Sequence, residues 1–176
     1  MSSLNKGVGK VEVALMWDPS PAGEPDTDLD LIAATYERDD LHGDPSYLVH
    51  FDARSPDGTI TLNRDSTTGQ GFGPDELLTL EFERIPESLG RVVVGVAIQQ
   101  RPTPRTFAEV AGGAIRIREG VLDLFEGDFT DVARYTAATV AEFVRDDSGA
   151  WQYQPLVQGF DADPATFVTV MGRPRG

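Results

Sequence analysis

The densest group of reactive side chains lies in the segment GEPDTDLDL, which carries carboxylates at Glu24, Asp26, Asp28 and Asp30. The three aspartates are spaced by two, so an extended chain would place them on one face. Residues two apart in a strand are separated by ~7 Å, and at an effective dielectric of ~20 each adjacent pair of charges costs roughly 2 kcal/mol. A divalent cation would remove that cost, and oxygen ligands without Cys or His beside them favour calcium. A solvated acidic loop at the entrance of a strand explains the same spacing equally well.

A second acidic stretch, rich in glycine, covers residues 52–76. Asp65, Asp75 and Glu76 offer carboxylates there, and the neighbouring glycines let backbone carbonyls turn inward as further oxygen ligands. Taken alone, this stretch favours a β-hairpin followed by a loop, because it also contains an Asp-Gly turn signal. An EF-hand is a poorer interpretation of the first segment, since the position that must turn sharply is Leu31 and not Gly.

Composition excludes several classes of function. The chain of 176 residues has 29 acidic and 15 basic side chains, a formal charge of −14, which makes nucleic acid an unsuitable partner. It has no Cys, which rules out disulfides, thiolate nucleophiles and Cys-based zinc sites. The two histidines, His42 and His50, lack the neighbours that a catalytic or transition-metal site needs. A hydrolase with paired carboxylates finds no support in the sequence, so we expect a protein that is not an enzyme.

Apolar and polar residues alternate with period two through much of the chain, which is typical of strands with one face on a core. The predicted fold is mainly β, a β-sandwich of two antiparallel sheets with a few short helices, in a single domain covering residues 1–176. No apolar run reaches the ~20 residues of a membrane span, and the N-terminus lacks a secretory signal, so we expect a cytoplasmic protein that is not an integral membrane protein. The predicted strands are 10–17, 29–36, 47–51, 58–62, 77–82, 91–98, 113–119, 121–126 and 151–157. Short helices are predicted at 106–110 and 163–172, and the ambiguous segment 136–151 favours strand.

Ordered motifs along nearly the whole chain resemble the TerD family of tellurite-resistance and general-stress proteins. Each motif is weak alone, but their order is specific. They are LNKG (4–7), WDP (17–19), the DLD of 28–30, SPDG (55–58), Asp65, Gly69, the DE pair 75–76, Phe107, Val110, AIRI (114–117), Arg-Tyr (134–135), Trp151 and the QG of 158–159.

The resemblance implies a β-sandwich that binds calcium ions and has no established catalytic activity, with other stress and tellurite-resistance proteins as partners. Carried over by position, it implies the metal ligands Asp28, Asp30, Asp52, Asp65, Asp75 and Glu76. The sequence departs from the family pattern at Phe51, Leu62, Arg64, Gln70 and Phe72. Gln70 and Phe72 support an alternative, a divergent member with weakened or lost calcium binding that acts as a protein-interaction scaffold.

Overall fold

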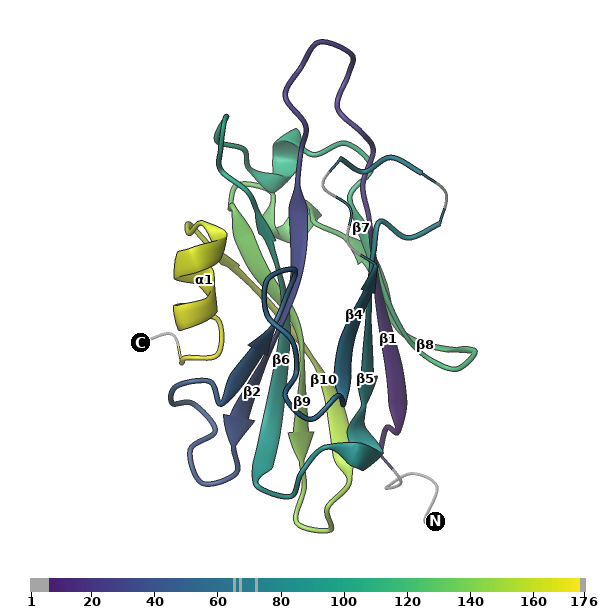
Figure 1. Cartoon of the computed structure of the whole chain (residues 1–176), viewed down its shortest axis with the longest axis vertical. Coiled ribbons are helices and arrows are strands. Elements are labelled where there is room, and N and C mark those ends of the chain that lie inside the picture. Colours follow the sequence, from purple (N-terminus) through teal and green to yellow (C-terminus); the bar gives the residue numbers. More distant parts are fainter. Residues whose placement is uncertain (1–6, 65, 67, 72, 175–176) are drawn as a thin grey trace.

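Two five-stranded antiparallel sheets pack face to face (Figure 1). The computed structural model describes residues 7–64, 66, 68–71 and 73–174. Sheet A has the strand order β4-β5-β1-β7-β8, and sheet B has the order β10-β9-β6-β2-β3. The strands are β1 (Lys10–Met16), β2 (Leu29–Glu37), β3 (Tyr47–Val49), β4 (Ile60–Arg64), β5 (Glu76–Glu81), β6 (Leu89–Ile98), β7 (Ala114–Glu119), β8 (Leu122–Asp128), β9 (Ala137–Arg145) and β10 (Trp151–Phe160). The helices are the short 3-10 turns η2 (Phe82–Arg84), η3 (Phe107–Glu109) and η4 (Thr130–Val132), and α1 (Pro164–Val170).

The main core lies between the sheets and follows the period-two pattern of the sequence. In β1, Val11, Val13 and Leu15 are fully buried, whereas Lys10 and Glu12 are exposed. The predicted β-sandwich is therefore confirmed, and its strands turn apolar side chains inward as the alternation requires.

A smaller core lies on the outer face of sheet B, where α1 covers the sheet (Figure 1). Strand β6 is buried along its whole length because it has sheet A on one side and α1 on the other. Phe167 of α1 packs over Gly95, where an added Cβ atom would lie 2.6 Å from the Phe167 ring. The helix begins as the sequence predicts, with Pro164 in its first turn and Asp163 accepting a hydrogen bond of 2.9 Å from the Thr166 backbone N–H.

Several predicted elements have different limits. The strand predicted at 47–51 ends at Val49, because His50 and Ala53 close a tight turn through hydrogen bonds of 3.0 and 3.1 Å. The predicted helix 106–110 is the single 3-10 turn η3. Strand β10 continues past Pro155 to Phe160 by shifting its register, which is tolerated because β10 is an edge strand. None of the helices in the described part of the chain is long and apolar enough to cross a membrane.

The SPDG motif forms the connection from β3 to β4. Its Asp57 carboxylate accepts hydrogen bonds from the Ser55 hydroxyl at 2.5 Å, the Thr59 N–H at 2.9 Å and the Thr59 hydroxyl at 2.6 Å. The Tyr47 hydroxyl adds a contact of 3.2 Å from β3. Gly58 supplies the positive φ that this turn needs, which is why β4 begins at Ile60 and not at residue 58.

The hydrogen bonds to the Asp57 carboxylate contribute to the free energy of unfolding by an amount that depends on pH. Burial alone would raise the pKa of Asp57, but the hydrogen bonds from Ser55, Thr59 and Tyr47 outweigh it and hold the pKa below its ordinary value of 3.8. A carboxyl group whose pKa is depressed by folding contributes stability above its unfolded pKa, and that contribution is lost as pH falls through the folded pKa. We expect Asp57→Asn to lower the free energy of unfolding by about 1 kcal/mol at pH 6, and the difference from wild type to shrink below about pH 4. Urea unfolding between pH 3 and pH 7 measures it, with the exposed Asp39→Asn as control; a constant difference would contradict the assignment.

Candidate metal centre

The start of β2 and the start of β5 meet at one end of the gap between the sheets. In β5, Glu76 lies on the same face as Leu78 and Leu80, so period two turns its side chain inward, toward sheet B. Strand β3 pairs with residues 33–35 of β2, so the first residues of β2 lie beyond the end of β3. Glu76 reaches this part of β2, where its Oε1 accepts a hydrogen bond of 3.0 Å from the Leu31 backbone N–H.

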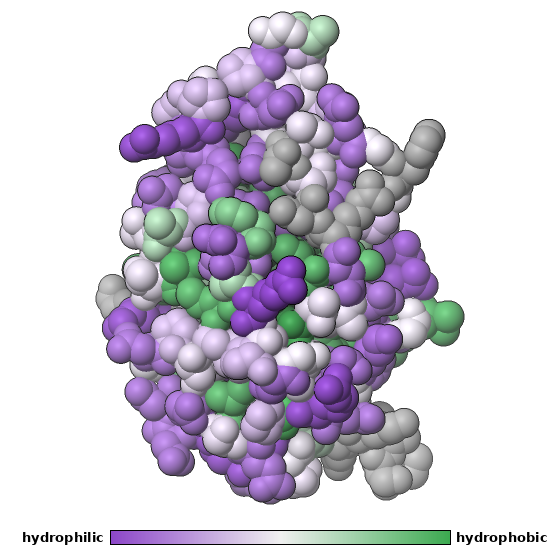
Figure 2. Space-filling view, viewed as in Figure 1, coloured by the Kyte–Doolittle hydropathy of each residue, from purple (hydrophilic) through white to green (hydrophobic). Residues whose placement is uncertain are grey.

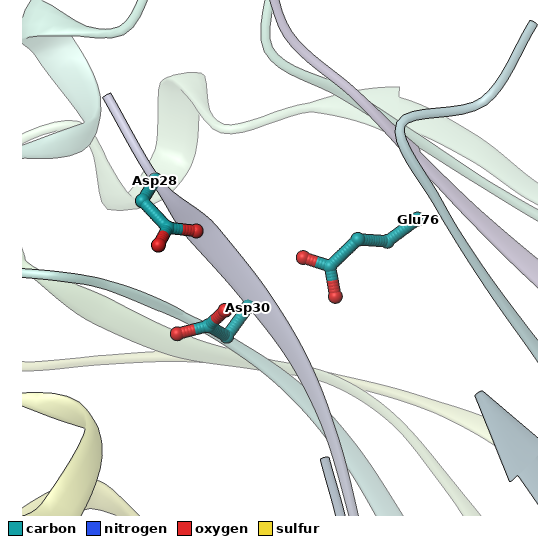
Figure 3. Close-up of side chains that lie close together, drawn as sticks. All are labelled: Asp28, Asp30 and Glu76. Atoms are coloured by element: carbon teal, nitrogen blue, oxygen red, sulfur yellow. The ribbon is translucent and has the colours of Figure 1, made fainter. Parts of the chain in front are cut away.

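Three carboxylates converge around this edge of β2. One oxygen from each of Asp28, Asp30 and Glu76 lies within 4.8 Å of the others. Glu76 is 0% exposed and Asp30 is 2% exposed, while Asp28 is partly buried. Figure 3 shows the Glu76 side chain directed across the gap toward the two aspartates, which project from neighbouring points along one strand. The predicted DLD segment and the predicted DE pair are thus brought together, although 45 residues separate Leu31 from Glu76.

Gln99 contacts this acidic segment from the other side. It follows the last residue of β6, the strand that pairs with β2 in antiparallel register, Leu29 opposite Ile98. The Gln99 side-chain amide donates to Asp30 Oδ2 at 2.6 Å, and its backbone N–H donates to the Asp28 carbonyl at 2.9 Å. The sequence alone does not predict a role for Gln99, because its contacts depend on the strand register and no local motif marks it.

Asp75 lies beside Glu76 in sequence but makes a different contact. It is 3% exposed, and its Oδ2 accepts a hydrogen bond of 2.8 Å from the Trp17 backbone N–H at the end of β1. The Trp17 indole N–H in turn donates to the Thr27 carbonyl at 2.9 Å, immediately before Asp28. Asp75 and Trp17 therefore connect the two acid-bearing segments, and Trp17 is buried as the sequence analysis expects.

The other predicted ligands are placed differently. Asp52 is exposed in the turn after β3, where it lines a cavity together with Asp30. Burial lowers the pKa of the neighbouring His50, and the negative charge of Asp52 acts against that shift. Asp65 and Phe72 lie outside the described residues, as does the side chain of Arg64.

The donor set suits a hard divalent cation. Two unit charges 4.8 Å apart repel by roughly 3 kcal/mol at an effective dielectric of about 20, so three ionised carboxylates in this space favour a bound counter-charge. All of the side-chain donors are oxygens, and calcium accepts irregularly placed carboxylate oxygens more readily than magnesium does. The cluster Asp28, Asp30 and Glu76 is therefore a group that can hold a metal ion.

Comparison with known proteins identifies the family. A sequence model of the TerD domain matches residues 1–170. The chain belongs to the TerD family. The tellurium resistance proteins TerD of Alcaligenes sp. and of Serratia marcescens are each 28% identical to this TerD-family chain, over 91% of it and 85% of their own length. General stress protein 16U of Bacillus subtilis is 22% identical, over 98% of this chain and 92% of its own length.

Solved structures of TerD-like proteins share the fold closely. SAV2460, described as a protein of unknown function, superposes with a TM-score of 0.94 at 58% identity, covering 97% of this chain and 100% of its own. A homologue of telluride resistance protein TerD, SCO6318 from Streptomyces coelicolor A3(2), superposes with a TM-score of 0.93 at 50% identity, covering 96% of this chain and 100% of its own. The TerD resemblance inferred from ordered motifs is confirmed.

Proposed function

We propose that this TerD-family chain acts in tellurium resistance or the general stress response, and that it does so by binding calcium and not by catalysis. The names of its relatives support the first part. The observation that carries the second part is the convergence of Asp28, Asp30 and Glu76 from opposite sheets. When bound, the ion would supply positive charge at the edge of β2; the chain's part is to hold three carboxylates in place.

Two features of the protein prepare this site for a cation. Gln99 fixes the Asp30 carboxylate by hydrogen bonding, and the Leu31 N–H fixes Glu76, so binding requires little ordering of these two side chains. Asp52, Asp65 and Asp75 remain proposed ligands on the strength of the family resemblance. Because the ligands come from both sheets, a bound ion would cross-link sheet A to sheet B, and binding would be linked to folding stability.

Calorimetric titration tests the proposal. Calcium is added to protein stripped with a chelator, and magnesium is added in a parallel experiment. We expect saturable calcium binding in wild type and a loss of affinity of more than about tenfold in Asp28→Asn, because one of three charged ligands is neutralised. Asp26→Asn is the matched control, since Asp26 is exposed and lies only two residues earlier in the same segment. Equal affinity in wild type and Asp28→Asn would contradict the site.

A third variant tests whether the loop before β5 contributes a calcium ligand. Asp65→Asn is expected to weaken calcium binding if the loop before β5 supplies a ligand, as the family resemblance implies. Unchanged affinity in this variant, together with a loss in Asp28→Asn, would restrict the site to the three clustered carboxylates. No binding of calcium or magnesium at millimolar concentration to any of the proteins would overturn the proposal and favour the scaffold alternative.

A further inference from the structure

A cavity of about 310 Å³ lies on the outer side of sheet B, between β2, the turn after β3 and the first turn of α1. Ile32, Pro164 and Val168 give it apolar walls. Figure 2 shows apolar side chains gathered in the middle of this face of the molecule, between the positions of α1 and β4 in Figure 1, with hydrophilic side chains around them. This size, a concave shape and largely apolar walls are the usual properties of a small-molecule site.

The charged side chains that line the cavity have a negative net charge. Asp30, Asp52 and Asp163 carry carboxylates and Arg101 carries the guanidinium, so the balance is three negative charges against one positive, or −2. Asp30 is 2% exposed and forms part of the inner wall, whereas Asp52 and Asp163 are exposed at the rim. His50 Nδ1 accepts a hydrogen bond of 3.2 Å from the Asp52 backbone N–H, which holds the imidazole beside the cavity. An anionic ligand would therefore meet net repulsion in this cavity.

The rim also presents an aromatic surface. Phe51 is 54% exposed, and its ring centroid lies 5.5 Å from that of His50. An exposed aromatic ring beside carboxylates is well suited to a cation, which the ring face attracts. Phe51 is also one of the positions at which this chain departs from the TerD pattern.

From this combination we infer that the cavity binds a small organic cation, an ammonium group carried on an apolar group about the size of one ring. The apolar part lies against Ile32 and Val168, and the ammonium lies near Asp30 and Asp52 with Phe51 beside it. This cavity lies on the outer side of sheet B, whereas Glu76 reaches β2 from sheet A. Asp30 borders both sites and Asp52 is also a proposed calcium ligand, so binding of the organic cation is measured without metal.

The probe is benzylamine, titrated into wild-type protein in buffer containing a chelator and followed by two-dimensional NMR. We expect saturable shifts of resonances around Phe51 and Val168, with a dissociation constant of about millimolar or tighter. Benzyl alcohol has the same shape without the charge and is expected to bind roughly five- to tenfold more weakly. Benzoate is expected to bind more weakly still. Benzoate that binds as tightly as benzylamine, or benzylamine that does not saturate, would overturn the inference.

Two pairs of variants locate the site. Ala165→Trp places a large ring at the cavity rim and is expected to weaken benzylamine binding by at least about tenfold, because the ring occupies the ligand's space. Thr169→Trp, on an exposed position one turn further along α1, is the control and should bind as wild type does. Equal benzylamine affinity in Ala165→Trp and Thr169→Trp would show that benzylamine binds outside this cavity and would contradict the inference.

The second pair tests the role of charge. The double variant Asp52→Asn with Asp163→Asn removes two rim charges, and Asn can still cap α1, so the fold is retained. Its benzylamine affinity is expected to fall roughly three- to tenfold, in line with the strength of partly exposed ion pairs. Asp39→Asn with Asp131→Asn removes the same total charge from exposed positions outside the cavity and should change affinity less than twofold. Similar losses in both double variants would mean that net charge alone attracts the amine, which contradicts a built site.

Discussion

Glu76→Gln is expected to have opposite effects on stability with and without calcium. The amide keeps an oxygen that can accept the Leu31 N–H, so the substitution removes a charge while preserving the shape of the side chain. Without metal, removing one of three clustered carboxylates should raise the free energy of unfolding by about 1–2 kcal/mol. With calcium at a hundred times its dissociation constant, wild type should gain ~2.7 kcal/mol, a rise in melting temperature of roughly 5–10 °C, and the variant should gain little.

Thermal unfolding with a chelator and with millimolar calcium measures both effects in one series. Glu12→Gln is the control, because Glu12 is an exposed glutamate on the neighbouring strand β1 and should respond to calcium as wild type does. A calcium shift in Glu76→Gln equal to that of wild type would show that Glu76 is not a ligand. A loss of stability in the metal-free variant would contradict the account of repulsion within the cluster.

Arg91→Met is expected to lower the free energy of unfolding by about 3–5 kcal/mol. Arg91 is 5% exposed on β6, and its Nε and Nη2 atoms both lie 2.8 Å from Glu142 Oε2 on β9. Its Nη1 donates to the Leu41 carbonyl at 3.1 Å and to the Gly172 carbonyl at 2.6 Å, just after α1. The substitution leaves a largely buried carboxylate without its cation and leaves two carbonyls without this donor.

Urea unfolding at pH 7 measures the loss, and two further variants separate its causes. Arg84→Met breaks a surface ion pair, in which the Arg84 side chain is 57% exposed and the Glu81 side chain is 34% exposed. This substitution should lower the free energy of unfolding by less than about 1 kcal/mol. Arg91→Met combined with Glu142→Met removes both charges and should recover part of the stability, because no uncompensated charge remains. A loss below about 1 kcal/mol in the single variant would show that the pair contributes no more than a surface ion pair.

Most of the β-sandwich could be predicted from the sequence, because the pattern of apolar residues that marks a strand lies within that strand's own residues. Alternation in 10–17 and the apolar run of 91–98 predict β1 and the central strand β6 with small errors at their ends. The ends of strands depend on turns, and Asp57 and Gly58 form the turn before β4, so this strand begins at Ile60 and not at residue 58 as predicted. Segment 136–151 could not be assigned by period alone, because pairing on both sides, with β6 and with β10, determines that β9 is a strand.

The candidate site was predictable in its residue types and less so in its geometry. The spacing of Asp28 and Asp30 predicts a shared face, and period two places Glu76 with Leu78 and Leu80. The contact between β2 and β5 joins different sheets, so no local pattern reports it. Sequence reasoning likewise did not separate Glu76, which joins the cluster, from Asp75, which accepts the Trp17 N–H. Which of the two side chains faces β2 depends on where β5 begins and on which face of the sheet its first residue lies.

The bond between Glu76 and the Leu31 N–H has a second consequence, for the backbone of β2. Strand β3 pairs only with residues 33–35 of β2, so it does not reach the Leu31 N–H. Leu31 and Glu76 are both 0% exposed, so this donor lies where a lost partner is not readily replaced by water. The side chain proposed to hold the ion therefore also completes the hydrogen bonding of a strand edge, and a substitution that shortens it would leave a buried N–H without this acceptor.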